Sequence, residues 1–324
     1  MTAVFLRGVG IVEDVANYYG AMSLSPANKP AMPEAEVIID LEMVRRLVAT
    51  QAEQWADEDL RYLATGWDNE IYRLGESLIV RLPRRQLGED IGVKERRWLP
   101  HLVEATGVDV GSVIFEGHPT TDYPFTFSIC RYVSGNSAAQ LARQERDRYV
   151  AEFSSLLRAL HQPSNSTEPK SDFRGCPLSA VDQRTREQIA VLDPSLQARA
   201  LEVWQEAVDA KPFGGHPVWL HGDPHPHNTI VDSQQAHSSV SLIDFGDLCV
   251  GDPASDLGMI WMHFSAEGID QAFENYGIKS GSSTWLRARG WGLRFAMLMA
   301  KLDDDDLLGV VGRETLQLLL EESS

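Results

Sequence analysis

Two loop segments in the second half of the chain hold residue types that could bind a metal ion and move a proton. In the segment HGDPHPHN at 221–228, Asp223 is followed five residues later by Asn228. A carboxylate can accept the proton of an attacking hydroxyl, and an amide oxygen can hold Mg²⁺ on phosphate oxygens. Sixteen residues beyond Asn228 lies Asp244, in the triplet DFG, with a second carboxylate for the metal. Together these residues indicate phosphoryl transfer from a nucleoside triphosphate to a hydroxyl.

Short strands are predicted to position both segments. The runs VWL, TIV and VSLI between Val218 and Phe245 have strand character, so Asp223 and Asp244 each follow a strand end. The spacing Asp-x-x-x-x-Asn is that of a kinase catalytic loop. Asp223 could instead cap a helix, and Asp244 could be a turn residue. These two separate roles would not explain why Asp223, Asn228 and Asp244 occur together in the order and spacing of a kinase site, so we favour the catalytic interpretation.

The first half of the chain predicts a mainly β unit. Asp40 is placed to cap a helix that begins at the next residue. Between residues 60 and 82, short alternating runs predict three antiparallel strands, with a hairpin turn at Gly75. We further expect a helix over about 92–106 and strands at 112–116 and 125–132.

The rest of the chain is predicted to be mainly helical, apart from the strands around the two loop segments. Apolar residues form one stripe over 146–161, and Pro194 opens a helix that reaches about residue 210. Four helical segments follow Phe245, the last of them after the acidic run 303–306.

The composition excludes several classes of protein. The 324 residues are 43% hydrophobic and 23% charged, which is typical of a globular protein. Lys and Arg total 29 against 47 Asp and Glu, and the net charge of −18 argues against a nucleic-acid partner. Three cysteines without metal-ligand spacing predict no disulfide framework. Without a long apolar run or a signal-peptide pattern, we expect a cytoplasmic protein with no membrane partner; the sequence does not predict its oligomeric state.

The two motif segments resemble a known enzyme family. HGDPHPHN, followed by LIDFGDLCVGDPASDLGMIW at 242–261, is similar to the aminoglycoside phosphotransferase family, which includes macrolide kinases and choline-kinase relatives. The family's signature is an HGD-x-x-x-x-N loop, an Asp-x-Gly metal site and GDP-x-x-D-L, and all three are present. The resemblance covers about residues 40–320.

This resemblance implies an α+β, protein-kinase-like fold with two lobes. A poorly packed extension over 1–35 would precede an N-lobe over 36–134, with an antiparallel sheet and one or two helices. A mainly helical C-lobe over 135–324 would carry the catalytic loop, the metal site and the acceptor site.

The resemblance also implies roles for particular residues. Asp223 would be the catalytic base, while Asn228 and Asp244 would be the Mg²⁺ ligands. Three residues would have structural roles at the site: His221, Asp252 and Asp256, the last bracing the catalytic loop from the start of a helix.

The segment GWDNEIYRLGESLIVRLPRR at 66–85 resembles the family's nucleotide-covering hairpin. Gly66 is expected to supply an unusual φ, and Asn69 a side-chain amide, so that backbone donors can face phosphate; a plain β-turn is the alternative. Arg81 stands where kinases place the lysine that grips the α- and β-phosphates. We expect Glu95 to be its ion-pair partner, with a solvated surface residue as the alternative, and we expect the two arginines at 84–85 to be surface charges.

The interlobe hinge is predicted over Ile129 to Tyr132, including Arg131. Adenine would bond to backbone groups there, so side-chain identity carries little information. The co-substrate would be ATP or GTP, with no preference readable from the sequence.

Alternatives remain open for the acceptor and for the histidines. His221, His225 and His227 could form a zinc cluster, although no further ligand completes a tetrahedral set. The family implies a carboxylate-rich pocket for aminoglycosides and a more apolar one for macrolides, and the chain has candidates for both near its C-terminus. The acidic candidates are Glu267, Asp270, Glu274 and Asp303–Asp306, and the apolar candidates are Trp261, Met262, Phe264, Trp285, Trp291 and Met297. We expect a small-molecule hydroxyl acceptor, most simply an aminoglycoside or macrolide-type antibiotic. A metabolic kinase for an amino alcohol or sugar and a nucleotide-binding pseudokinase scaffold are the alternatives.

Overall fold

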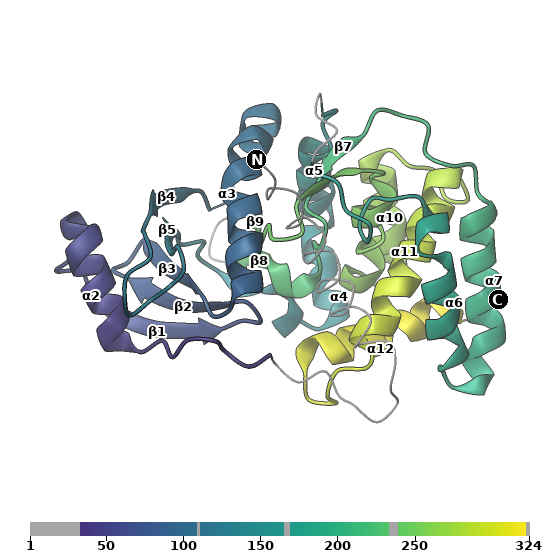
Figure 1. Cartoon of the computed structure of the whole chain (residues 1–324). Helices are drawn as coiled ribbons and strands as arrows, with labels where there is room; N and C mark the ends of the chain where they lie inside the picture. Colours follow the sequence, from purple (N-terminus) through teal and green to yellow (C-terminus); the bar gives the residue numbers. More distant parts are fainter. Residues whose placement is uncertain (1–32, 109–110, 165–168, 233–238, 322–324) are drawn as a thin grey trace, which may run out of the picture.

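The computed structural model of the chain describes residues 33–108, 111–164, 169–232 and 239–321. In these residues a β-sheet lies beside a larger helical lobe, and helix α3 (Gln86–Thr106) stands between them (Figure 1). The α+β, two-lobed fold predicted from the sequence is therefore confirmed. The predicted extension, 1–35, lies outside the described residues except for its last three.

The smaller lobe is built on a five-stranded antiparallel sheet in the order β1-β2-β3-β5-β4. Its strands are β1 (Leu60–Thr65), β2 (Asn69–Leu74), β3 (Leu78–Pro83), β4 (Val113–Glu116) and β5 (Ser128–Arg131). Gly75, with φ of +55°, makes the predicted turn between β2 and β3. One face of the sheet is buried against helix α2 (Leu41–Gln51), which leaves the other face toward α3 and the second lobe.

Helix α2 begins where the sequence predicts. The carboxylate of Asp40 accepts a hydrogen bond of 2.8 Å from the backbone N–H of Met43, one of the donors at a helix start that has no partner within the helix. Val44, Leu47 and Val48 are buried against the sheet.

The larger lobe is mainly helical. Its longer helices are α5 (Val150–Leu160), α6 (Asp182–Ala190), α7 (Pro194–Asp209), α10 (Ala266–Tyr276), α11 (Ser283–Met299) and α12 (Leu307–Leu320). The short helices are α4 (Arg143–Arg146), α8 (Ala254–Leu257) and α9 (Ile260–His263). Leu99 and Leu102 of α3 belong to the hydrophobic core of this lobe, while α3 also contacts β3 of the other lobe. Helix α3 therefore links the two lobes.

Two small antiparallel sheets carry the motif segments. Strands β7 (Val218–Leu220) and β10 (Cys249–Gly251) form one, and β6 (Asn136–Ser137), β8 (Thr229–Asp232) and β9 (Ser239–Leu242) form the other. Segment 221–228 joins β7 to β8, and segment 243–248 joins β9 to β10. Both loops thus connect the same two sheets, which places them side by side.

Some element boundaries differ from the prediction. Helix α3 begins at Gln86 rather than near residue 92, and a Cβ on Gly88 within it would lie 2.5 Å from the backbone oxygen of Asp68. Gly88 is needed in the helix because the backbone of Asp68 lies so close, but in a sequence a glycine is more typical of a loop, so the start of the helix was predicted too late. Helix α5 begins at Val150, after two short helical turns, and strand β10 is too short to have a sequence pattern.

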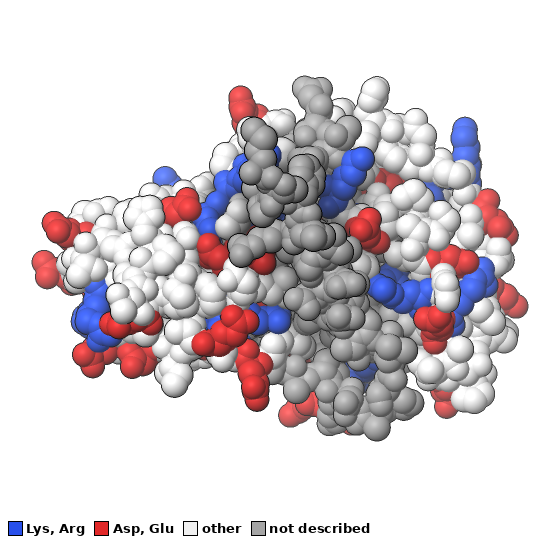
Figure 2. All heavy atoms as spheres, in the orientation of Figure 1, with Lys and Arg blue, Asp and Glu red and all other residues white. Residues whose placement is uncertain are grey.

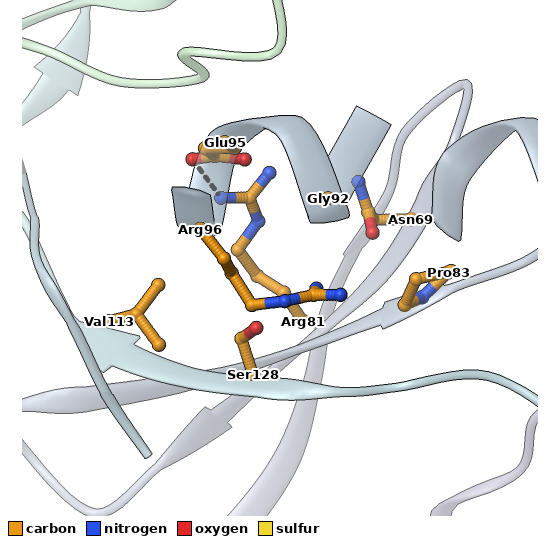
Figure 3. A pocket seen from close by; sticks show the side chains of 8 residues that line it. All are labelled: Asn69, Arg81, Pro83, Gly92, Glu95, Arg96, Val113 and Ser128. Carbon is orange, nitrogen blue, oxygen red and sulfur yellow. Dashed lines mark hydrogen bonds and ion pairs between the residues drawn. The ribbon is translucent and has the colours of Figure 1, made fainter. Parts of the chain in front are cut away.

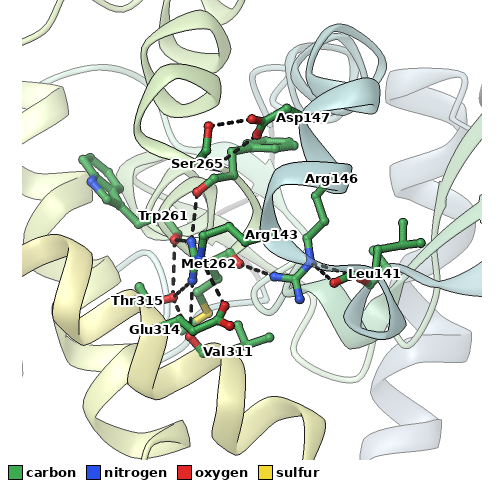
Figure 4. A network of polar contacts seen from close by, with 12 residues as sticks. Leu141, Arg143, Arg146, Asp147, Trp261, Met262, Ser265, Val311, Glu314 and Thr315 are labelled. Carbon is green, nitrogen blue, oxygen red and sulfur yellow. Dashed lines mark hydrogen bonds and ion pairs between the residues drawn. The ribbon is translucent and has the colours of Figure 1, made fainter.

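Two buried arginines on α4 hold the helices behind the motif loops. Arg143 donates hydrogen bonds of 2.7 Å to the carbonyl of Trp261 and 2.8 Å to the hydroxyl of Thr315 (Figure 4). Arg146 donates one of 3.0 Å to the carbonyl of Met262. Since carbonyls at a helix C-terminus lack partners within the helix, the two guanidinium groups satisfy the end of α9 and tie it to α12.

Charged side chains of both signs are scattered among other residues on the surface of the molecule (Figure 2). On the face shown in Figure 2, Lys and Arg lie among Asp and Glu over both lobes. None of the helices in the described ranges is long and apolar enough to cross a membrane.

Candidate active site

Asp256 holds the start of segment 221–228, the segment predicted to be the catalytic loop. The backbone N–H groups of His221 and Gly222 donate hydrogen bonds of 2.8 and 3.0 Å to its carboxylate. Asp256 is fully buried at the short helix α8, and Nε2 of His161 lies 3.2 Å from Oδ2. The bracing contact that the sequence predicts for Asp256 is present.

Gly222 brings the two motif loops into direct contact. Its φ is +91°, and a Cβ at this position would lie 2.3 Å from the backbone oxygen of Asp247. A side chain is therefore excluded here both by backbone conformation and by space.

The carboxylate of Asp223 lies between two nitrogen-bearing side chains. Nη2 of Arg174 is 3.5 Å from Oδ1, and Nε2 of His225 is 3.4 Å from Oδ2. Burial alone would raise the pKa of Asp223, but His225 and Arg174 outweigh this effect and hold the pKa well below its usual range. Oδ1 is buried and accepts no hydrogen bond from the described residues. Asp223 is thus a carboxylate with one oxygen that lacks a hydrogen-bond donor.

The hairpin formed by β8 and β9 brings Asn228 next to the segment that holds Asp244. The backbone N–H of Ile243 donates a hydrogen bond of 2.9 Å to the carbonyl of Asn228. The side-chain Nδ2 of Asn228 donates one of 3.1 Å to the backbone carbonyl of Asp223. This contact leaves Oδ1 of Asn228 as the amide atom available to a metal ion.

Asp244 has an unusual backbone. Its φ is +63°, and no other non-glycine residue in the described ranges has a positive φ. Such a conformation costs free energy and is often found at functional sites. The residue is exposed, but the protein groups around its carboxylate reduce its hydration and raise the pKa of Asp244. Arg81 opposes this shift and Glu95 adds to it. A bound cation would favour the ionised form here.

Arg81 and Glu95 join β3 to α3. Nη1 of Arg81 lies 2.8 Å from Oε1 of Glu95, and both side chains are largely buried (Figure 3). The Glu95 carboxylate raises the pKa of Arg81 above its ordinary value, so the guanidinium stays charged. The ion pair expected from the sequence is therefore present. It borders a small, open hollow lined by Asn69, Arg81, Pro83, Gly92, Glu95, Arg96, Val113 and Ser128.

Two arginines that follow strand β3, Arg84 and Arg85, stabilise the turn between β1 and β2. The backbone N–H of Gly66 donates a hydrogen bond of 2.8 Å to the carbonyl of Asn69. Nη1 of Arg84 donates one of 3.1 Å to the carbonyl of Gly66, and Arg85 binds the carboxylate of Asp68 at 2.7 and 3.0 Å. Both arginine side chains are at most 15% exposed, so the prediction that they are surface charges was wrong.

Gly66 does not have the conformation expected of it. Its φ lies outside the left-handed region, and the nearest atom to a Cβ there would be 3.6 Å away. The expectation of an unusual φ at Gly66 was wrong, because hydrogen bonds to Asn69 and Arg84 close the turn with an ordinary backbone.

The segment predicted as the interlobe hinge includes the end of strand β5. Ile129 is fully buried in the core of the smaller lobe, and its position inside β5 is paired with both neighbouring strands. Arg131 is exposed at the end of β5. The backbone N–H of Tyr132 donates to the carbonyl of Ser77 at 2.8 Å, so this amide already has a partner.

The histidines have structural partners. Nε2 of His221 donates to the carbonyl of Ile243 at 3.0 Å, and its Nδ1 accepts from the backbone N–H of Asp223 at 3.1 Å. Nδ1 of His225 accepts from the backbone N–H of Asn228 at 3.2 Å. Within the described parts of the chain, no three His, Cys, Asp or Glu residues cluster in a way that could hold a metal ion. Because both nitrogens of His221 are engaged, the geometry does not support the zinc alternative.

Asp252 is also a structural residue. Its carboxylate lies 2.6 and 3.3 Å from Nε and Nη2 of Arg287 on α11, and it accepts from the backbone N–H of Ala254 at 3.0 Å. Arg287 and Asp252 are both buried. The contact connects the GDP-x-x-D-L segment to helix α11.

The apolar and acidic side chains considered for an acceptor pocket include residues with structural roles. The apolar candidates are core residues: Trp261, Met262, Phe264, Trp291 and Met297. In the acidic run, Asp306 caps α12 by accepting hydrogen bonds from the backbone N–H groups of Leu308 and Gly309. Neither set identifies the acceptor.

Sequence reasoning missed two residues, Arg174 and His263, that contact the loops. Arg174 bridges Asp223 and Asp247, with Nη2 3.5 and 3.1 Å from the two carboxylates. His263 donates from Nε2 to the carbonyl of Pro224 at 2.9 Å, and its Nδ1 accepts from the hydroxyl of Tyr149 at 2.8 Å. Burial holds the pKa of His263 well below its usual range, so it stays neutral. These residues are far from the loops in sequence and belong to no motif.

An antiparallel sheet and a helical lobe, with an ion-paired arginine on one side and three polar loop residues on the other, define a protein-kinase-like enzyme. The sequence profile described as the phosphotransferase enzyme family matches residues 59–291, and the chain belongs to this family. It is a kinase. A search of curated protein sequences found no significant match.

Solved structures of antibiotic kinases have the same fold. The GDP and kanamycin complex of APH(2")-IIIa is 18% identical, with a TM-score of 0.59, over 86% of this chain and 98% of that one. The streptomycin–ATP ternary complex of APH(2")-IIa is 18% identical, with a TM-score of 0.56, over 88% and 100%. The macrolide 2'-phosphotransferase MphH from Brachybacterium faecium is 20% identical, with a TM-score of 0.56, over 88% and 99%. At these identities the similarity shows the fold.

Proposed function

We propose that this kinase transfers the γ-phosphoryl group of ATP or GTP to a hydroxyl of an aminoglycoside or macrolide-type antibiotic. The observation that carries the proposal is the set of hydrogen bonds that links Asn228 to Asp223 and to the neighbour of Asp244. Asn228 is hydrogen-bonded to the backbone of Asp223 through its side chain and to Ile243, beside Asp244, through its carbonyl. Few arrangements other than a kinase site place these residue types together at the ends of paired strands.

Asp223 would orient the acceptor hydroxyl and accept its proton. Its Oδ1 lacks a hydrogen-bond donor among the described residues, and an attacking hydroxyl is such a donor. The depressed pKa makes Asp223 a weak base. This suits phosphoryl transfer, in which catalysis consists mainly of positioning and electrostatic stabilisation.

Asn228 and Asp244 would hold Mg²⁺. Hard oxygen ligands, few in number, are what Mg²⁺ takes when a triphosphate supplies the others, and these two side chains provide an amide oxygen and a carboxylate. The carboxylate of Asp244 accepts a long hydrogen bond, of 3.3 Å, from the backbone N–H of Gly246, which leaves it able to bind a cation. The ion would neutralise charge on the phosphate oxygens.

The nucleotide would lie between the lobes. Arg81, kept charged by Glu95, would bind phosphate in place of the usual lysine. The turn at Gly66–Asn69 would cover the phosphates, and backbone groups at Arg131 and Tyr132 would flank adenine. The division into an N-lobe over 36–134 and a C-lobe over 135–324 is part of the same proposal.

The intact Arg81–Glu95 pair favours an enzyme over a nucleotide-binding scaffold, since the phosphate anchor is charged and fixed in place. The choice of antibiotic acceptors rests on the similar structures, whose titles name kanamycin, streptomycin and macrolide phosphotransfer. A metabolic amino alcohol or sugar is the second acceptor class to test.

The test is a turnover screen with Mg²⁺ and either ATP or GTP over aminoglycosides, macrolides, amino alcohols and sugars. Release of nucleoside diphosphate, together with the mass of one added phosphoryl group on the acceptor, is the expected result. Asp223→Ala should abolish turnover and keep nucleotide binding, measured as a Mg²⁺-dependent thermal shift. Asp209→Ala, at an exposed aspartate on α7, is the matched control. Nucleotide binding without diphosphate release on any acceptor would favour the scaffold.

A further inference from the structure

Arg174 lies outside the motifs that carry the proposed activity, yet it contacts acidic residues of both loops. Its Nη2 is 3.5 Å from Oδ1 of Asp223, in the catalytic-loop segment. The same atom is 3.1 Å from Oδ2 of Asp247, in the segment that carries Asp244. The Arg174 side chain is only 6% exposed, while the carboxylates of Asp223 and Asp247 are 22% and 35% exposed.

The segment that presents Arg174 is fixed by its own contacts. The carbonyl of Gly175 accepts a hydrogen bond of 2.9 Å from the backbone N–H of Asp252. Gly175 has a φ of +60°, and a Cβ on Gly251 would lie 2.3 Å from its carbonyl oxygen. This close backbone approach seats Arg174 on the β7–β10 sheet, from which the catalytic-loop segment begins.

The guanidinium is also held on its face. Its central carbon lies 4.5 Å from the ring centroid of Phe295 on α11, and Phe295 is fully buried. A planar guanidinium stacked on an aromatic ring has few orientations left. Its donors can therefore serve two carboxylates at once without the loss of side-chain entropy that a free arginine would incur.

The result is a carboxylate held on both sides. Arg174 faces Oδ1 of Asp223, and His225 faces Oδ2 at 3.4 Å. Asp247 contacts the same guanidinium group. A displacement of either loop would therefore break the bridge that Arg174 makes between the two loops.

We propose that Arg174 is a positioning residue, which orients the Asp223 carboxylate and joins the catalytic loop to the loop that carries Asp244. The proposal rests on the function proposed above, since it assigns Arg174 an effect on phosphoryl transfer that acts through Asp223. It also makes a claim about the two loops that holds in the absence of any acceptor.

The kinetic test compares Arg174→Gln and Arg174→Lys with wild type on an acceptor from the screen. Misplacement of a catalytic group by about 1 Å can cost about 100-fold in rate, so kcat should fall about 100-fold in Arg174→Gln. The KM for ATP should change by less than about twofold, because Asp223, through which Arg174 acts, is not among the groups proposed to bind the nucleotide. Lysine keeps the charge but not the planar fork, so Arg174→Lys should recover part of the rate. Arg199→Gln, which removes an arginine from an ion pair with Glu202 on α7, is the matched control.

The structural test is amide hydrogen exchange measured by mass spectrometry without acceptor. In Arg174→Gln, exchange should rise about tenfold in peptides covering 221–228 and 244–249, with α2 and α7 unchanged. Equal exchange in wild type and variant, or a uniform rise over the whole chain, would overturn the proposal. A local rise with an unchanged kcat would overturn it as well. If wild type phosphorylates no acceptor, the proposed function fails, while the exchange result still decides whether Arg174 joins the two loops.

Discussion

The carboxylate of Asp256 accepts a hydrogen bond of 2.8 Å from the backbone N–H of His221, across 35 residues of chain. A second bond, from Gly222, makes this one side chain the support for the first two residues of the catalytic loop. The GDP-x-x-D-L segment therefore has a physical role in shaping the loop that precedes Asp223.

Asp256→Ala should destabilise the protein and disorder the loop. The substitution leaves two buried N–H groups without acceptors, at about 1–3 kcal/mol each, so the free energy of unfolding should fall by about 3 kcal/mol. Urea unfolding followed by tryptophan fluorescence measures this change. Asp209→Ala on α7 should stay close to wild type, and a loss of less than about 1 kcal/mol in Asp256→Ala would show that the carboxylate does not support the loop.

Gly222→Ala should lower the free energy of unfolding more than the same substitution at another glycine with a positive φ. A Cβ at Gly222 would lie 2.3 Å from the backbone oxygen of Asp247, while one at Gly107, with φ of +69°, would meet nothing within 4 Å. Gly107→Ala therefore measures the cost of the left-handed conformation alone, about 1 kcal/mol. Gly222→Ala should lose about 3 kcal/mol of unfolding free energy and its turnover, because one loop must move away from the other. Equal losses in the two variants would mean that the loops adjust freely.

Glu95→Gln should weaken nucleotide binding. The substitution keeps the shape of the side chain but removes the charge that lies 2.8 Å from Nη1 of Arg81, so the guanidinium is held less firmly toward the phosphates. We expect the KM for ATP and for GTP to rise about tenfold, with a smaller change in kcat. Glu42→Gln is the control, because Glu42 pairs with Arg46 on α2 with its side chain 84% exposed. An unchanged KM in Glu95→Gln would remove the pair from the nucleotide site.

The sequence predicted those features that depend on local spacing. The helix that Asp40 caps, the turn at Gly75 and the strands before both motif loops have short-range signals, and all are present. The pairing of Arg81 with Glu95 followed from the resemblance to kinases, which places a phosphate-binding cation at the end of this strand and its partner on the next helix.

The errors have a common physical cause. Arg84 and Arg85 look like surface charges in sequence because their partners, Gly66 and Asp68, lie across a hairpin. Arg174 carries no motif at all, since its role depends on the fold bringing residues 174, 223 and 247 together. A lone arginine before a glycine, in a segment without helical or strand periodicity, was the available signal.

Cys130 should make the protein sensitive to alkaline pH. Burial raises the pKa of this thiol to about 11 from an ordinary value of 9.0, while Arg81 opposes the shift. Because the folded state holds the proton more tightly than the unfolded state, this stabilisation is complete below pH 9 and is lost as the pH rises toward 11. Between pH 8 and pH 10, wild type should lose about 1 kcal/mol more unfolding free energy than Cys130→Ala, in which the titrating group is absent. Urea unfolding of both proteins at the two pH values gives the difference, and parallel losses would show that the Cys130 thiol ionises as readily in the folded chain as in the unfolded one.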